Sequence, residues 1–77
     1  MSWNHRVLAF EHKGSAYFQI HEVYYDENGV PNSYTEKAVS VSAEEFKDLE
    51  WTLNKMKECL KKDVLWGDER FPQIYEK

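Results

Sequence analysis

Three side chains, Arg6, His21 and Glu36, have the types that acid–base chemistry requires. An imidazole titrates near neutrality, a carboxylate can orient it, and a guanidinium can hold an anion. If the strands that carry them pair as argued below, the three form a charged row across a sheet. An open sheet offers no concave pocket, so the pattern favours a structural row. The alternative is an enzyme or small-molecule binder in which a partner closes a pocket over this row.

The histidines and the cysteine do not have the spacing of a metal site. His5, His12 and His21 lack a cysteine pair or an HExxH pattern beside them. Neighbouring residues of a strand, such as His21 and Glu22, face opposite sides and cannot share an ion. We predict no metal and no cofactor, with His5 and Glu22 forming a polar pair near the rim of the core. Cys59, the only cysteine, is expected to be a small buried hydrophobe.

Composition narrows the class of protein. A chain of 77 residues forms one domain, and so small a domain often depends on a partner subunit or a metal for stability. The net charge of −4 argues against nucleic acid as a partner. The sequence contains no apolar run of roughly 20 residues and no leader, which argues against membrane insertion. Together with the lone cysteine, these features predict a cytoplasmic protein.

The elements that must position these residues are predicted to be three strands and one helix. Strands are expected over about 3–11, 16–25 and 33–41, joined by turns at Lys13-Gly14 and Asn28-Gly29. Ser42 and Glu45 have the spacing of a capping box, with Val41 and Phe46 as a hydrophobic staple. The fold class is therefore α+β: a three-stranded antiparallel β-meander followed by one amphipathic helix packed on one sheet face. The domain is predicted over 1–65, and 66–77 is a tail that docks on the domain or on a partner.

Both faces of the predicted sheet carry apolar residues. A two-residue turn at Lys13-Gly14 places Trp3 beside Tyr24 and His5 beside Glu22. This side, the helix face, should receive the apolar stripe of the helix, which consists of Phe46, Leu49, Leu53, Met56 and Leu60. The opposite side, the aromatic face, carries too many large side chains to remain in water: Leu8, Phe10, Tyr17, Val23, Tyr25 and Tyr34. We expect the tail, a second subunit or a ligand to cover it.

The second strand also resembles a group of short bacterial proteins. Tyr17–Asp26 (YFQIHEVYYD), then Gly29 and Ser33-Tyr34-Thr35-Glu36, resemble a pattern of the type Y-x-I-H-E-V-Y-Y-D-x-x-G…S-[WY]-T-E, although two residues and not one separate Tyr17 from Ile20. The group also shares an opening W-x-x-R-V and a closing K-x-V-L, and both are present here. The resemblance covers about 3–65. It implies a family and lends no activity, because none is known for the group.

The predicted function is that of a small non-enzymatic interaction protein. It should form a homodimer or bind a protein partner through its aromatic face, or through Trp51, which points away from the helix stripe. The candidate ligand- or partner-binding residues are Arg6, Phe10, Tyr17, His21, Tyr25, Tyr34, Glu36 and Trp51. No catalytic residue is assigned.

Overall fold

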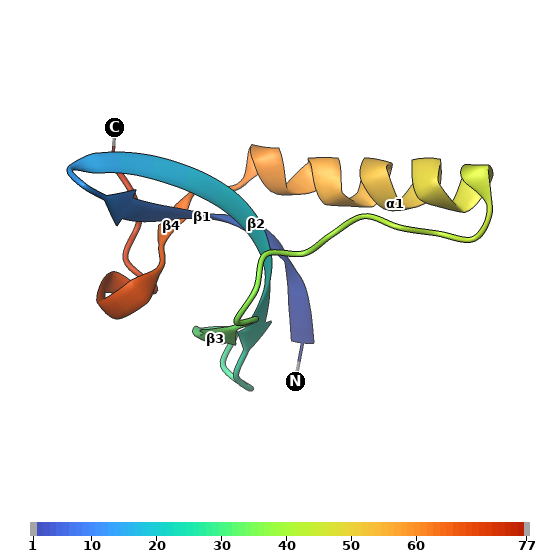
Figure 1. The fold of residues 1–77 in the computed structure, drawn as a ribbon. Helices are drawn as coiled ribbons and strands as arrows, with labels where there is room; N and C mark the ends of the chain where they lie inside the picture. Colours follow the sequence, from blue (N-terminus) through green and yellow to red (C-terminus); the bar gives the residue numbers. More distant parts are fainter. Residues whose placement is uncertain (1, 77) are drawn as a thin grey trace.

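A long, curved β-hairpin forms the centre of the computed structural model, which describes residues 2–76 (Figure 1). Its strands are β1 (Ser2–His12) and β2 (Ser15–Tyr25). Trp3 pairs with Tyr24 and His5 with Glu22, so the predicted register is confirmed. Lys13 and Gly14 both have positive φ, 52° and 81°. Two positive values are typical of a type I′ turn, whose twist matches that of the strands it joins.

The third strand is shorter than predicted. β3 (Pro31–Tyr34) pairs with β2 in the expected register at Tyr24–Ser33, but an irregularity then sets Tyr25 opposite Pro31. The turn is longer than the two residues expected, because the carboxylate of Asp26 accepts hydrogen bonds from the N–H groups of Asn28 and Val30 (2.8 and 3.0 Å). Beyond Tyr34 the chain keeps only scattered backbone bonds to β2.

A fourth strand makes the sheet mixed. β4 (Leu65–Trp66) lies parallel to β1, with Leu8 opposite Leu65 and Ala9 opposite Trp66, in the order β3-β2-β1-β4. The α+β class is confirmed, whereas the description as three antiparallel strands is only partly right. A strand of two residues has no periodicity of its own, so its sequence carried no strand signal.

The helix begins later than the capping box predicts. α1 (Phe46–Lys57) continues into a 3₁₀ turn, η1 (Glu58–Lys61). Glu45 is the N-cap residue with extended φ and ψ of −122° and 146°, and no side chain caps the helix. Glu45 therefore lies outside the helix and cannot serve as the third helical residue of a box opened by Ser42. The staple is also wrong, because Phe46 is 83% exposed.

The helix packs on the sheet through its C-terminal end only. Met56 of α1 and Cys59 of η1 are buried on the helix face of the sheet, where Val7 and Ala9 are also buried. Figure 1 shows the N-terminal half of α1 extending beyond the hairpin, with the 35–45 connection running below it. The predicted burial of the whole apolar stripe is thus wrong for most of its length.

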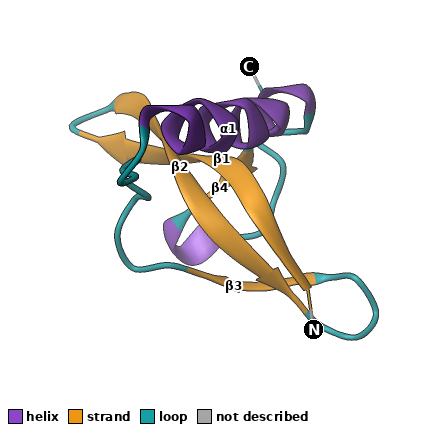
Figure 2. Cartoon of the chain, turned by 90° about the vertical axis from the view of Figure 1, so that its right-hand side faces the viewer, coloured by secondary structure: helices purple, strands orange, loops and turns teal. Residues whose placement is uncertain are grey.

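The main core lies on the aromatic face. It consists of Leu8, Phe10, Val23 and Leu65, with Tyr25, Tyr34 and Phe71 packed against it. Tyr34 is the last residue of β3, whereas Phe71 lies in the tail, directly after a second 3₁₀ turn, η2 (Asp68–Arg70). Figure 2 shows α1 in front of the sheet and this turn behind it. The tail therefore covers the aromatic face. No helix within 2–76 is both long enough and apolar enough to span a bilayer.

Candidate functional site

The structure does not leave Arg6, His21 and Glu36 as an open row, because Arg6 is half-buried and His21 is buried. Arg6 and His21 are cross-strand partners, as expected. Their side-chain hydrogen bonds, however, go to other groups, and Glu36 is exposed beyond the end of β3. The tail or the sheet also covers Phe10, Tyr25 and Tyr34, while Tyr17 remains 45% exposed.

Arg6 holds the tail and the sheet together. Its Nη1 donates to the hydroxyl of Tyr25 at 2.9 Å, and its Nη2 donates to the backbone oxygen of Asp63 at 2.7 Å. The Tyr25 hydroxyl in turn donates to Oδ1 of Asn4 at 2.7 Å. The Nη2 bond fixes the chain that leads into the tail, whereas the buried Nε of Arg6 has no hydrogen-bond partner among the described residues. The geometry therefore gives Arg6 a structural role, since these two terminal nitrogens already have partners within the protein.

His21 is buried in a polar niche under Tyr34. Only 1% of its surface is exposed, and its Nδ1 lies 2.9 Å from the backbone oxygen of Thr35, to which it donates. Nε2 lies 3.1 Å from the side-chain amide of Gln19. Burial disfavours the charged imidazolium and lowers the pKa of His21, and the bond to Thr35 offsets part of that effect. A substrate cannot reach this ring, because Phe10, Tyr34 and the bonded Thr35 and Gln19 enclose it.

The tail approaches the sheet closely at Gly67, which the sequence reasoning missed. Its N–H donates to the backbone oxygen of Ala9 at 2.8 Å, and a Cβ at this position would lie 2.5 Å from the ring of Phe10. The next N–H, of Asp68, donates to the hydroxyl of Tyr34 at 2.9 Å. Only glycine fits so near an aromatic ring. A glycine set directly after Leu65-Trp66 was the one signal that could have marked this approach.

Two further contacts hold the tail from its outer side. The guanidinium of Arg70 lies 3.5 Å from the centre of the Trp66 ring, which is within cation–π distance. The same group forms an exposed ion pair with Glu11 at 3.3 Å. Phe71 packs edge-on against Tyr34, with ring centres 4.9 Å apart. These contacts explain why the predicted tail is rich in aromatic residues.

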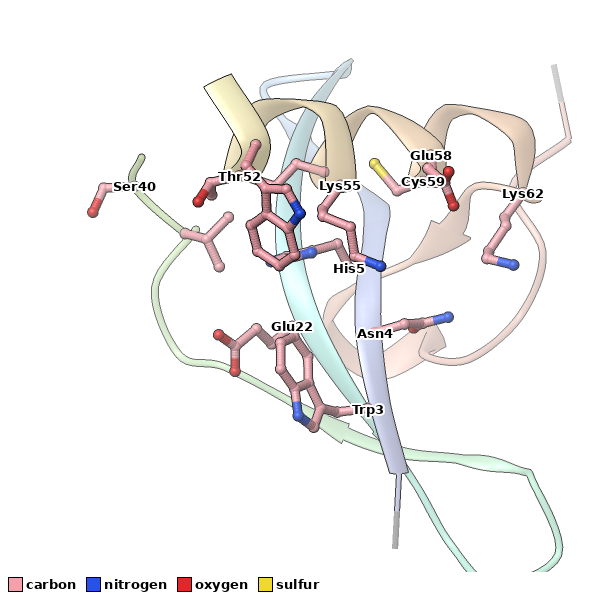
Figure 3. Close-up of a pocket in the computed structure, with 13 residues that line it drawn as sticks. Trp3, Asn4, His5, Glu22, Ser40, Thr52, Lys55, Glu58, Cys59 and Lys62 are labelled. Carbon is pink, nitrogen blue, oxygen red and sulfur yellow. The ribbon is translucent and has the colours of Figure 1, made fainter. Parts of the chain in front are cut away.

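The opposite side of the sheet is hollow where α1 stands over it. A cavity of about 690 Å³ lies between the helix and the N-terminal part of the hairpin (Figure 3). Figure 3 shows Trp3, His5 and Glu22 reaching it from the sheet, and Thr52 and Lys55 reaching it from the helix. Its remaining lining consists of Asn4, Val39, Ser40, Trp51, Met56, Glu58, Cys59 and Lys62. Trp51 thus lies at the edge of this cavity, where it is 64% exposed and does not pack under the tail.

The polar groups of this cavity pair differently from the prediction. His5 and Glu22 are opposite one another, but Glu22 accepts a hydrogen bond from the Tyr24 hydroxyl at 2.8 Å, and that bond raises the pKa of Tyr24. The His5 ring instead meets the Trp3 ring edge-on, with centres 5.4 Å apart. Cys59 is buried, as expected, and burial raises the pKa of its thiol, which makes it a poor nucleophile at neutral pH.

The other flank of α1 borders an apolar groove. Leu53 and Leu60 form its helix side, and Val39 and Val41 of the connection form the other side, above Ile20 of β2. The groove encloses about 600 Å³. Among residues 2–76, no three histidine, cysteine, aspartate or glutamate side chains lie close enough to hold a metal ion.

Comparison of the chain with family models, with curated proteins and with solved structures found no match. The resemblance to the short bacterial proteins stays a prediction. The function must therefore be argued from the two sides of the sheet alone.

Proposed function

We propose that this chain is a small non-enzymatic interaction protein that self-associates as a homodimer. The observation that carries the proposal is the surface it leaves in water. The accessible area is 6011 Å² for a chain of 9.2 kDa. A folded monomer of that mass has about 4,900 Å², so the excess is about 1,100 Å². A stable interface buries about 800 Å² on each partner.

The dimensions of the molecule agree with this excess. Its radius of gyration is 13.3 Å, whereas a domain of this length has about 11.5 Å. The difference comes from α1, which extends beyond the hairpin instead of lying flat on it (Figure 1). A helix of 12 residues with one buried side chain has little support of its own in water. A partner that covers it supplies the missing support.

The exposed apolar residues indicate where the partner binds. Most of the large ones in the described chain lie on or beside the helix: Trp3, Phe46, Trp51, Leu53 and Leu60. Phe18 is also exposed, but its ring packs edge-on against Tyr75 of the tail. The aromatic face, from which the sequence argued for an interface, is already covered by the tail. The surface proposed for association is therefore the helix side. A patch of this kind on a soluble protein is typical of an interaction site.

Size-exclusion chromatography with light scattering tests the proposal directly. The full chain should elute with twice the mass of one copy at micromolar concentration. A monomer that persists at high micromolar concentration contradicts self-association.

The cavity between α1 and the hairpin supports a second candidate, a small-molecule binder. A volume of about 690 Å³ falls within the range of ligand pockets, about 300–1,000 Å³. Its two tryptophans and the ammonium of Lys55 suit a flat aromatic anion. This site replaces the row of Arg6, His21 and Glu36, whose histidine is enclosed.

Titration with the aromatic anion 1-anilinonaphthalene-8-sulfonate tests this second candidate. Saturable binding of one dye per chain that Lys55→Ala weakens, and that Lys61→Ala outside the cavity leaves unchanged, supports it. Binding that does not saturate, or that ignores Lys55, contradicts it.

A further inference from the structure

We propose that two copies of this chain join through α1, with their helices antiparallel and crossing at Leu53. This inference rests on the proposed function and specifies its surface. The occupant of the apolar groove beside α1 is then the helix flank of a second copy. Three observations carry it: a straight apolar line on the helix, the distribution of charge along that helix, and the unburied area.

The apolar line consists of Phe46, Leu53 and Leu60. The three residues are seven positions apart, so they lie on nearly the same side of a helix. Their exposed fractions are 83%, 49% and 65%, although the stripe neighbour Met56 is buried against the sheet. The line therefore occupies the flank of α1 and not its sheet-facing side. A spacing of seven residues is the one that lets two helices pack along their length.

The groove next to this line gives a second copy a place to sit. Leu53 and Leu60 form one wall, and Val39 and Val41 form the other. An apolar side chain from another molecule would meet apolar groups on both walls, with Asn54 and Lys57 of the helix beside them. With the two-fold axis at Leu53, Phe46 of one copy meets Leu60 of the other. Each copy then contributes the same line and the same groove, as a two-fold interface requires.

The charge distribution along α1 favours the antiparallel direction. The first half and the residues before it carry mostly acidic groups, which are Glu44, Glu45, Asp48 and Glu50. The second half and η1 carry mostly basic groups, of which Lys57 and Lys61 lie beside Leu60, whereas Lys55 faces the cavity and takes no part in the pairing. Antiparallel helices bring the acidic half of one copy against the basic half of the other. Parallel helices would set like charges together, which is unfavourable.

One pair of charges is placed to report the arrangement. Glu50 and Lys57 flank the apolar line on the side away from Met56, one turn before and one turn after Leu53, and Lys57 also lines the groove. About a two-fold axis at Leu53, Glu50 of one copy lies beside Lys57 of the other, and the pair occurs twice. These positions correspond to the flanking charges that select partner and orientation in paired helices.

The unburied area is large enough for an interface, and the charge pattern favours a second copy over a different protein as the partner. The excess surface, about 1,100 Å² from the total of 6011 Å², exceeds what one side of a standard interface buries. Its charge pattern is complementary to itself, so no second kind of chain is needed to satisfy it. The net charge of −4 is small enough for two copies to associate at physiological salt.

Sedimentation equilibrium on the full chain and five variants tests the arrangement. Leu53→Asp should raise the dimer dissociation constant by more than about tenfold, because it places two carboxylates at the crossing point. Glu50→Lys and Lys57→Glu should each weaken the dimer several-fold. The double variant Glu50→Lys/Lys57→Glu should restore it, because the pairs re-form with reversed sign. Lys55→Glu, on the cavity side of the helix, is the matched control and should leave association unchanged.

The outcomes distinguish the dimer itself, the use of α1 as its interface and the antiparallel direction of the helices. A wild-type dimer that survives Leu53→Asp overturns this arrangement and leaves the proposed function standing. A double variant as weak as the single ones overturns the antiparallel direction. A wild-type chain that is monomeric overturns the proposed function itself. Circular dichroism of each variant verifies that the fold is intact, and the exposure of Leu53, Glu50 and Lys57 makes this the expected result.

Discussion

His21 shows how a residue suited to catalysis becomes part of a core. Its ring nitrogens are engaged by Thr35 and Gln19, and Phe10 and Tyr34 pack around it, with ring centres 5.5 and 5.3 Å away. Desolvation favours the neutral ring, in which Nδ1 keeps its hydrogen bond to the backbone oxygen of Thr35. The hydrogen bonds of His21 therefore stabilise the fold, and its ring is not available to a substrate.

The lowered pKa of His21 predicts a loss of stability in mild acid. Below about pH 6.5 the unfolded chain binds a proton at this residue that the folded chain resists, so the free energy of unfolding falls as pH falls. The slope contributed by one such group is at most about 1.4 kcal/mol per pH unit. Urea unfolding from about pH 7 to pH 5 measures it. In His21→Asn this part of the slope should vanish, while His12→Asn, at an exposed position, should keep it. Parallel profiles for wild type and His21→Asn would contradict the assignment.

Gly67 sets the distance between tail and sheet. Gly67→Ala would put a methyl group into the ring of Phe10, which is itself buried, and should cost about 1–3 kcal/mol of folding free energy. Because Phe10→Leu removes the ring atoms that the methyl meets, the costs of the two substitutions should not add. Thermal or urea unfolding of both single variants and of the double variant checks this. Strict additivity, or a cost for Gly67→Ala below about 0.5 kcal/mol, would show that the approach is not tight.

At the scale of elements, the tail and α1 have exchanged the roles that their sequences suggest. β4 contributes Leu65 to the core, and the tail packs Gly67 and Phe71 against it without forming a long element of its own. α1 is regular and amphipathic but contributes only Met56. Helical periodicity therefore predicted the helix correctly, but it predicted the packing of that helix on the sheet only in part.

Two substitutions near the C-terminus, one in β4 and one in the tail, test what holds the core. Leu65→Ala should cost about 2–5 kcal/mol, because Leu65 is 4% exposed at the centre of the core. Ile74→Ala, in the tail and 52% exposed, should cost much less. Urea unfolding of the two variants measures the difference. Equal costs would mean that the tail does not pack as described.

At the scale of the whole molecule, the chain has too much surface for a free-standing domain of its mass. Its hairpin is covered on one side by the tail and only in part on the other by α1. The uncovered part coincides with the exposed apolar line of the helix. In the proposed dimer, association would complete the second layer over the sheet.

Stability should therefore depend on protein concentration. If folding is coupled to dimer formation, raising the concentration raises the Tm by mass action. Thermal unfolding followed by circular dichroism over a hundredfold range of concentration measures this shift. The Leu53→Asp variant should show a lower Tm that no longer depends on concentration. A wild-type Tm that is constant over the range would contradict the coupling.

The sequence alone determined the local pairing. The β1–β2 register follows from one two-residue turn, because side chains in a strand alternate with period two and the turn fixes the count. The helix periodicity likewise located α1 to within a few residues. It also showed that the aromatic face, with Phe10, Tyr25 and Tyr34, needed a cover.

What covers each face was decided only by the tertiary structure. Leu65-Trp66 is too short to carry a periodic signal, and its pairing with β1 depends on contacts more than fifty residues apart in the chain. Arg6 and His21 were correctly set opposite each other, yet their partners Asp63, Thr35 and Gln19 come from backbone and side-chain positions that no spacing rule specifies. Local propensity and alternation act between near neighbours, whereas the choice between tail and helix depends on how two long-range packings compare in buried area.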